Sequence, residues 1–214
     1  AINSPLTINL NGTTENSPKP IGDELWSYTI NASYDNSPKA ILMIPDINGD
    51  EIDDVVVCSE DNAFRCFNGN SSGNADIFWE NTEHGSLYQQ NSLQIIEDIN
   101  SDSYSDVIIG TAWGDKSVIA LSGKTGETLW KYDTHIYGDG GWIYQVSCKY
   151  DYNNDGITDV LAASGDDADD AGPKRIHCLD GTDGTVIWEK YTGGPNFSVT
   201  GIADCNGDDI PDVI

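Results

Sequence analysis

The sequence has few basic residues, few histidines and no long hydrophobic run. Only 10 Lys and Arg stand against 36 Asp and Glu, which gives a formal net charge of -26. Nucleic acid and anionic membranes repel such a surface, so neither is an expected partner. No stretch approaches the roughly 18 apolar residues of a membrane-spanning helix. The three histidines, His84, His135 and His177, form no transition-metal pattern, and no Gly-rich phosphate loop or nucleophile motif is found.

An acidic segment of nine residues is present four times, and each copy runs into a β-branched apolar stretch. The copies begin at Asp46, Asp98, Asp151 and Asp204, so their spacings are 52, 53 and 53 residues. A repeat of about 50 residues built from short strands is typical of propellers, solenoids and arrays. The repeat therefore decides the fold class before any local prediction does.

The segments predict four calcium sites. Oxygen atoms at positions 1, 3, 5 and 9, with the backbone carbonyl of position 7, can converge on one hard cation if the chain curls around it. A polar hairpin turn is the alternative, since Asp, Asn and Gly favour turns, but a turn alone gives no reason for a carboxylate at position 9 in every copy. The predicted ligands, with the position-7 carbonyl donor fourth in each group, are Asp46, Asn48, Asp50, Ile52 and Asp54; Asp98, Asn100, Asp102, Tyr104 and Asp106; Asp151, Asn153, Asp155, Ile157 and Asp159; and Asp204, Asn206, Asp208, Ile210 and Asp212.

The helical calcium loop of EF-hand proteins does not fit these segments. It needs a bidentate Glu at position 12 and an exiting helix. Position 12 is Val57, Ile109 and Ala162 in the first three copies, and the residues around it are strand formers. These loops are therefore expected to connect two β-strands.

A second motif recurs out of phase with the first: a strand, a tight Gly turn and a strand that ends in Trp. It spans residues 121–130 and 179–188, with a longer version at 67–79. Each repeat then has four short strands, which in the second repeat are predicted at 92–97, 106–111, 117–122 and 127–132. Four antiparallel strands per repeat make a propeller blade, so the predicted fold is an all-β propeller. The Trp side chains are expected to pack between neighbouring blades.

The acidic segments resemble those of FG-GAP or VCBS-type repeats, the family that includes the calcium loops of the integrin α-subunit propeller. The Gly-turn-Trp segments resemble the docking motif of the pyrroloquinoline-quinone (PQQ) enzyme propellers. Together the two resemblances cover residues 21–214. They imply a calcium-stiffened β-propeller, secreted or on the cell surface, that serves as a platform for adhesion or ligand binding.

The domain organisation predicted is an extended leader or linker over residues 1–20, followed by propeller blades over residues 21–214. The blades correspond to about four repeats of roughly 53 residues with the last one truncated, so we expect an incomplete ring that is part of a longer propeller. Four glycosylation sequons begin at Asn11, Asn31, Asn70 and Asn196.

The five cysteines do not form a regular disulfide framework. Cys66 and Cys178 hold the same position in two repeats, which is typical of a small buried apolar side chain. Cys148 and Cys178 are expected to lie too far apart for a bridge. Cys58 and Cys66 flank one hairpin and are the local pair to test for a disulfide.

The loops at the end of the blades away from the calcium segments differ most between repeats, and they carry aromatic residues that suit a partner surface. We expect Trp113, Tyr137 and Trp142 to contact a ligand. The predicted function is a non-enzymatic, extracellular calcium-stabilised module for adhesion, assembly or ligand binding, with a protein, a glycan or neighbouring subunits as partner. One alternative is the propeller part of an enzyme, similar to a PQQ dehydrogenase or a polysaccharide lyase. Another is a structural array that positions other domains.

Overall fold

The computed structural model describes residues 22–30, 38–166 and 172–214. The predicted leader and the sequons at Asn11 and Asn31 lie outside them. The described chain is nearly all β-strand, with two short 3-10 helices, η1 (Gln90–Ser92) and η2 (Thr134–Tyr137). No helix in these ranges is long and apolar enough to cross a membrane.

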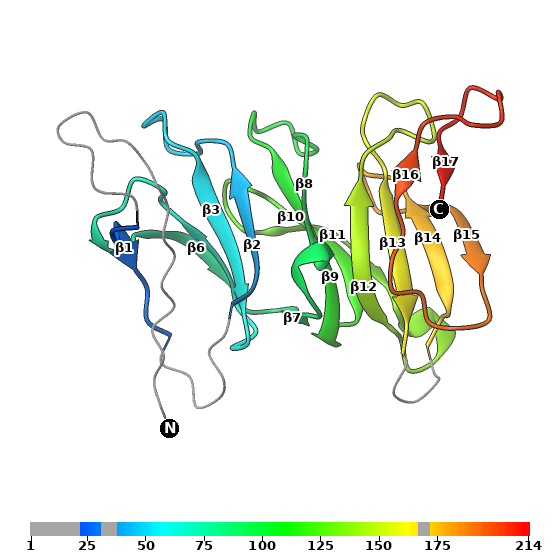
Figure 1. Ribbon diagram of the computed structural model, residues 1–214, viewed down its shortest axis with the longest axis horizontal. Coiled ribbons are helices and arrows are strands. Elements are labelled where there is room, and N and C mark those ends of the chain that lie inside the picture. The colour runs from blue at the N-terminus through cyan, green and yellow to red at the C-terminus, as the bar shows by residue number, and fades with distance from the viewer. Residues whose placement is uncertain (1–21, 31–37, 167–171) are drawn as a thin grey trace.

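The strands form successive antiparallel sheets of four strands, which stand side by side in a row (Figure 1). The first blade consists of β2 (Pro38–Ile44), β3 (Asp54–Ser59), β4 (Phe64–Phe67) and β6 (Ile77–Asn81). The second consists of β8 (Leu93–Ile96), β9 (Asp106–Gly114), β10 (Ser117–Leu121) and β11 (Thr128–Asp133). The third consists of β12 (Trp142–Cys148), β13 (Val160–Gly165), β14 (Arg175–Leu179) and β15 (Val186–Tyr191). These are the blades of a β-propeller, as the repeat predicts.

Shorter strands complete the described chain. A strand pair, β16 (Gly201–Ile202) and β17 (Asp212–Val213), flanks the fourth acidic segment. In the second blade, β9 extends three residues beyond the predicted end because β7 (Gly85–Leu87), from the link between blades, pairs with its last residues. At the other end of the row, β1 (Trp26–Ser27) pairs in parallel with β5 (Gly73–Asn74).

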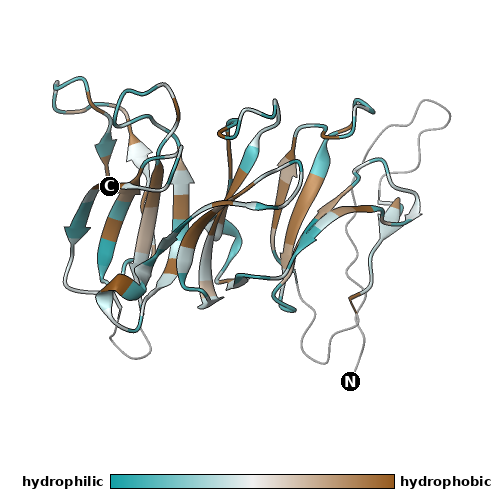
Figure 2. Ribbon diagram, turned by 180° about the vertical axis from the view of Figure 1, so that it is seen from behind, coloured by the Kyte–Doolittle hydropathy of each residue, from teal (hydrophilic) through white to brown (hydrophobic). Residues whose placement is uncertain are grey.

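Neighbouring blades pack through alternate residues of their strands. On β9, Val107 and Ile109 belong to the core cluster shared with the first blade, whereas Ile108 belongs to the cluster shared with the third. This follows from the period of two along a strand, which sends successive side chains to opposite faces. Because both faces are covered, all residues of β3 and β10 are buried and the strand centres are hydrophobic while the loops are polar (Figure 2).

Both boundaries between the three complete blades are joined by a Trp side chain, which confirms the predicted packing of Trp79 and Trp130. The indole N–H of Trp79 donates to Gly123 O in the next blade at 2.9 Å, and that of Trp130 donates to Gly181 O at 2.9 Å. Trp26 makes the same bond to Gly69 O at 3.3 Å, so β1 docks on the first blade as an outer strand.

All five cysteines are free thiols in the structure. Cys58 and Cys66 are both fully buried, but Cys58 lies opposite Phe64 and Cys66 opposite Val56 in the ladder, so they are not cross-strand partners. Burial raises the pKa of the Cys58 thiol to about 12. The local pair considered for a disulfide is therefore unbridged, and Cys148 and Cys178 are unbridged as expected.

Candidate functional sites: four acidic loops and an aromatic face

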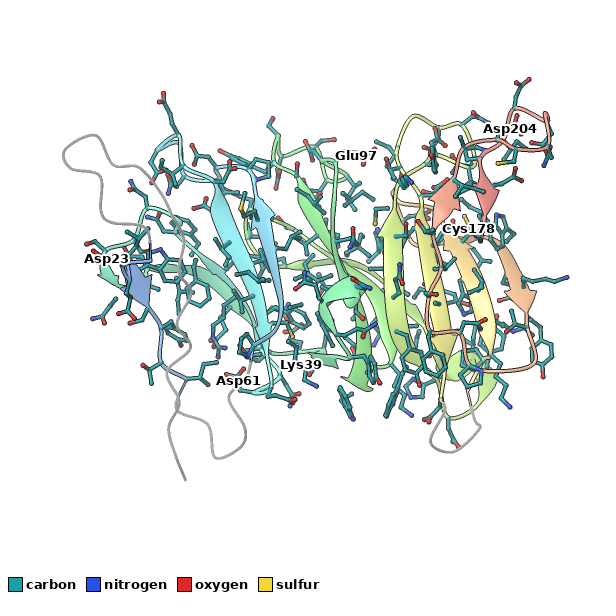
Figure 3. The ribbon with its side chains drawn as sticks, in the orientation of Figure 1. Asp23, Lys39, Asp61, Glu97, Cys178 and Asp204 are labelled. Atoms are coloured by element: carbon teal, nitrogen blue, oxygen red, sulfur yellow. The ribbon has the colours of Figure 1, made fainter. Side chains whose placement is uncertain are left out.

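The four acidic loops lie at the same end of the row of sheets, between the first two strands of successive blades (Figure 1). Figure 3 places Asp204, which opens the fourth loop, and Glu97, which precedes the second, at this end, and Lys39 at the opposite end. The predicted calcium ligands of different copies therefore face the same side of the molecule.

In every loop the aspartate at position 1 organises the backbone. In the first loop Asp46 Oδ1 accepts from the N–H groups of Asn48 at 2.9 Å and Gly49 at 2.7 Å, and its Oδ2 accepts from Glu51 N–H at 2.7 Å. Asp98, Asp151 and Asp204 make the equivalent bonds at positions 3 and 6 of their own loops. Although desolvation opposes it, the N–H donors Glu51, Gly49 and Asn48 lower the pKa of Asp46 from its ordinary value.

The side chains at positions 3 and 5 make hydrogen bonds within the same loop. Asp50 Oδ1 accepts from Ile52 N–H at 3.0 Å, and Asn48 Nδ2 donates to Asp50 Oδ2 at 3.2 Å. The position-5 bond recurs in the other three loops through Asp102, Asp155 and Asp208.

The backbone conformation is also common to all four copies. Positions 4 and 6 have positive φ in each: Gly49 and Glu51, Ser101 and Ser103, Asn154 and Gly156, and Gly207 and Asp209. One left-handed pattern in four segments of different sequence means that the loops share one structure and not merely a polar composition.

The aspartate at position 9 has a structural role that the sequence reasoning missed. Asp54 is fully buried; its Oδ2 accepts from Ile47 N–H at 2.9 Å and its Oδ1 from Gly69 N–H at 3.0 Å. Asp106 and Asp159 make the same bonds to Gly123 and Gly181. The carboxylate at position 9 therefore has a structural role without a metal ion, because it ties the acidic loop to the Gly turn of the same blade. The recurrence of a glycine 15, 17 and 22 residues further along the chain was the available signal.

Burial at position 9 has an electrostatic consequence. Desolvation raises the pKa of Asp54, and the nearby charges of Asp50 and Asp46 raise it further. Desolvation likewise raises the pKa values of Asp106 and Asp159. Among the described residues, no three His, Cys, Asp or Glu side chains converge into a metal-binding group.

The donor set of each loop nevertheless suits a hard cation. It consists of carboxylate, amide and carbonyl oxygens without sulfur or imidazole, and such ligands suit calcium and magnesium. Each carboxylate oxygen that accepts one N–H bond also keeps a second lone pair. On this chemistry the residues fit a calcium ion.

An aromatic cluster occupies the opposite end of the second and third blades. The rings of Trp113 and Trp142 lie 5.0 Å apart, and Tyr88 lies 6.2 Å from Trp113 and 5.8 Å from Trp142. Buried Tyr144 supports Tyr88 and also touches Phe197, at 4.9 and 4.8 Å. We call Tyr88, Trp113, Trp142 and Phe197 the aromatic face, because Tyr88, Trp113 and Phe197 are 37%, 40% and 51% exposed and Trp142 is half-buried.

Lys39 covers one side of this face. Its ammonium nitrogen lies 3.8 Å from the centroid of the Trp113 ring and 2.9 Å from Glu60 Oε1. A cation over an indole face is a favourable contact. Lys39, Tyr88 and Phe197 were not among the predicted ligand contacts, because Lys39 lies on β2 and the other two lie on separate links between strands.

Tyr137, the third predicted ligand contact, lies elsewhere. Its hydroxyl donates to Glu189, and the Arg175 guanidinium lies 4.8 Å from its ring. It belongs to a polar cluster with Tyr132 and buried His177. The structure therefore brings together Trp113 and Trp142 but not Tyr137.

No protein-family model matches the chain, and no curated protein sequence matches it. Among solved structures it is similar to rhamnogalacturonan lyase YesW, with a TM-score of 0.53, 14% identity, and coverage of 98% of this chain and 43% of that one. A rhamnogalacturonan lyase from Bacillus licheniformis gives a TM-score of 0.52 at 14% identity, covering 83% of this chain and 39% of that one. BamB from Moraxella catarrhalis gives 0.47 at 18% identity, covering 79% and 40%. The chain thus spans less than half of each of these proteins, and the likeness to the two lyases shows the propeller fold alone.

Proposed function

We propose that the chain is a calcium-stabilised β-propeller module that binds a ligand on its aromatic face. The observation that carries the proposal is the fourfold repetition of one loop structure, in which the carboxylate at position 1 accepts from the N–H of position 6 and the carboxylate at position 5 accepts from the N–H of position 7. Four loops of one geometry and one donor chemistry suit one ion each. The similarity to FG-GAP or VCBS-type repeats supports the same assignment.

Calcium would act here through charge. Asp46, Asp50 and Asp54 bring three carboxylates into one nine-residue loop, and the Asp54 carboxyl is buried against Gly69. A divalent cation neutralises two of these charges and removes the repulsion that raises the pKa of Asp54. Because Asp54 also holds the Gly turn, an ion in the loop would stabilise the blade as well as the loop.

The aromatic face supports the binding half of the proposal. Large aromatic side chains on a surface mark sites of interaction, since an exposed ring leaves apolar area in water. The rings come from two blades and the link that follows, so the propeller itself holds them in place. We propose that the ligand is a glycan, because stacked rings offer flat surfaces to sugar rings while a chain of charge -26 offers many acceptors for hydroxyl groups.

The proposed location is extracellular or at the cell surface. Calcium modules with dissociation constants of about 0.1 to 1 mM are typical of that environment. Asn70 is exposed and its amide donates to Asp50 Oδ2 at 3.2 Å, whereas Asn196 is half-buried and its amide donates to Ser164 O at 3.1 Å and Thr192 Oγ1 at 2.9 Å. If the protein is glycosylated, we therefore propose Asn70 as the modified residue.

Binding to a glycan array in saturating calcium tests the ligand assignment. Trp113→Ala and Trp142→Ala should each weaken binding at least ~10-fold, as expected for central aromatic contacts. Asp102→Ala, in a loop at the other end, should bind normally while folded. If both Trp variants bind as the parent does and folded Asp102→Ala does not, the assignment of the ligand to the aromatic face is wrong. If no glycan binds, the glycan assignment is wrong.

A further inference from the structure

A hydroxyl, an imidazole and a carboxylate from three separate segments lie in line at the boundary of the first and second blades. His84 Nε2 is 2.6 Å from Thr128 Oγ1, and His84 Nδ1 is 2.8 Å from Asp115 Oδ2. His84 is only 6% exposed. An ionised carboxylate only accepts hydrogen bonds, so Asp115 assigns the proton to Nδ1 and leaves Nε2 as the acceptor for the Thr128 hydroxyl.

The carboxylate has a second partner that favours its ionised form. Lys131 Nζ lies 3.1 Å from the same oxygen, Asp115 Oδ2. Desolvation acts against it, but the hydrogen bonds from His84 and Lys131 lower the pKa of Asp115 from its ordinary value. Asp115 therefore stays charged at neutral pH and holds His84 in one tautomer and orientation.

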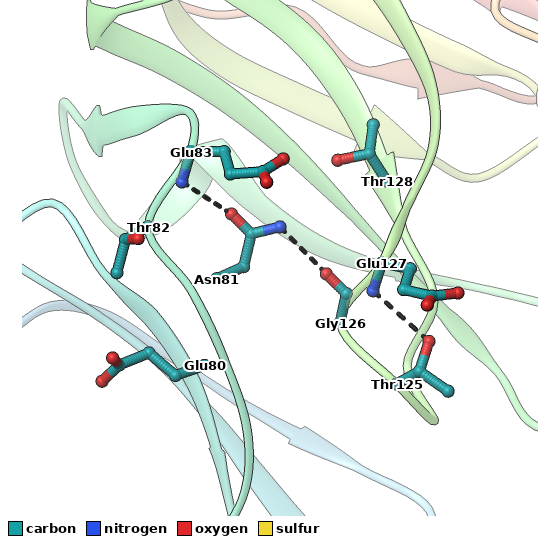
Figure 4. Close-up of a pocket in the computed structure, with 8 residues that line it drawn as sticks. All are labelled: Glu80, Asn81, Thr82, Glu83, Thr125, Gly126, Glu127 and Thr128. Atoms are coloured by element: carbon teal, nitrogen blue, oxygen red, sulfur yellow. Dashed lines mark hydrogen bonds between the residues drawn. The ribbon is translucent and has the colours of Figure 1, made fainter.

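Thr128 opens onto a cavity between the two blades, with a volume of about 420 Å³. Figure 4 shows its two walls, the end of β6 with the residues after it and the turn that leads into β11, joined by a bond from Asn81 Nδ2 to Gly126 O of 2.9 Å. A cavity of this size accommodates a small molecule. The hydroxyl next to the histidine is thus accessible to a substrate.

The arrangement is absent from the next blade boundary, although the repeat supplies a histidine there. His135 follows Trp130 by five residues, as His84 follows Trp79. Its Nδ1 bonds to Asp133 on its own segment at 2.6 Å, and the position of Thr128 is taken by Val186, two residues after the turn glycine. A hydrogen-bonded group that served only to hold neighbouring blades together would be expected at both boundaries.

We propose that Thr128, His84 and Asp115 form an acyl-transfer centre that hydrolyses small carboxylic esters without negative charge. A nucleophile bonded to a base, with the base oriented by a third group, is the geometric signature of such a centre. Glu83 and Glu127 line the same cavity, and their charges would repel an anionic substrate. The proposal does not depend on calcium or on the aromatic face.

The reaction needs no other reagent than water. Thr128 Oγ attacks the ester carbonyl carbon, and its proton passes to His84 Nε2 as the new C–O bond forms. The ester C–O bond then breaks, and His84 returns the proton to the departing alcohol. A water molecule attacks the acyl-threonine in the same way, giving its proton through His84 to Thr128 Oγ and releasing the acid.

Incubation of the whole chain with p-nitrophenyl acetate tests this assignment. We expect a burst of nitrophenolate of about one equivalent, with an acetyl group on the peptide that contains Thr128. Thr128→Val should abolish the labelling and lower the rate at least ~100-fold. Thr185→Val makes the same change at an exposed residue beside the Gly turn of the third blade, outside this cavity, and should leave the rate unchanged.

Asp115→Asn provides a second test that keeps the nucleophile. It reverses the hydrogen-bond preference at His84 Nδ1, so the rate should fall at least ~10-fold while the melting curve shows a folded protein. Absence of acetyl-Thr128 in the parent protein, or equal rates for the parent and folded Thr128→Val, would overturn the proposal.

Discussion

The indole ring of Trp79 lies directly against Gly126 of the next blade, where an added Cβ would come within 2.5 Å of the ring. Gly126 also has a φ of +73°, and Trp130 meets Gly184, with φ +74°, in the same way at the following boundary. The blades therefore dock through a large ring on one side and a bare, left-handed glycine on the other. This pairing explains why the Gly turn and the Trp recur together.

Gly126→Ala should destabilise the protein by about 2 to 5 kcal/mol. Left-handed backbone costs a residue with a Cβ about 1 to 2 kcal/mol, and overpacking of the ring adds about 1 to 3 kcal/mol. Gly193→Ala is the control, because Gly193 has a φ of +86° but no atom within 4 Å of the added Cβ. Urea unfolding should show a clearly smaller loss for the control; equal losses would mean that the contact with Trp79 is unimportant.

Asp54→Ala should destabilise the protein even when calcium is removed. The substitution leaves the N–H groups of Ile47 and Gly69 without their acceptor, and an unsatisfied buried donor costs about 1 to 3 kcal/mol. The control is Asp53→Ala, which removes an exposed aspartate next to it. Unfolding is measured in excess chelator, and an Asp54 variant as stable as the control would show that this carboxylate acts only through a metal ion.

The contribution of His177 to the free energy of unfolding should fall as the pH falls from about 6.5 towards 4. Burial holds the pKa of His177 down at about 4 against the opposing charge of Glu189, and the charge of Arg175 adds a smaller lowering effect. The unfolded chain then binds a proton in this window and the folded chain does not, so the stability is present above the unfolded pKa and is lost on acidification. The contribution of His177 is on the order of 3 kcal/mol.

His177→Gln tests that contribution. The loss of stability between pH 7 and pH 4.5, from urea unfolding at each pH, should be smaller in this variant than in the parent. The assignment is wrong if His177→Gln and the parent lose stability equally.

The sequence was sufficient to predict the four strands of a blade, because the signals for its strands and turns are local. The apolar runs of β3 and β9, the acidic loops and the Gly turns each predict their own element. Two features needed the tertiary structure: the extension of β9 to Gly114, which depends on pairing with β7, and the docking of Trp26 on Gly69, which lies 43 residues away.

For the candidate sites too, the sequence predicted local features but not contacts between distant segments. Spacing alone identified the loop residues, but it could not show that Asp54 also holds a glycine in another turn. Nor could it separate Tyr137, beside Arg175, from Trp113 and Trp142. His84 and Thr128 are 44 residues apart. His84 has an equivalent in the next repeat, His135, but the equivalent of Thr128 there is Val186, so the repeat does not associate the two residues.

Calorimetric titration of chelator-treated protein with calcium, together with a melting curve at each end of the titration, tests the calcium proposal most directly. We predict four ions per chain, one for each acidic loop, and three for Asp102→Ala. At ten times the dissociation constant each site should add about 1.4 kcal/mol of stability, so the melting temperature should rise markedly. No calcium uptake and an unchanged melting curve would contradict the assignment of these loops as calcium sites.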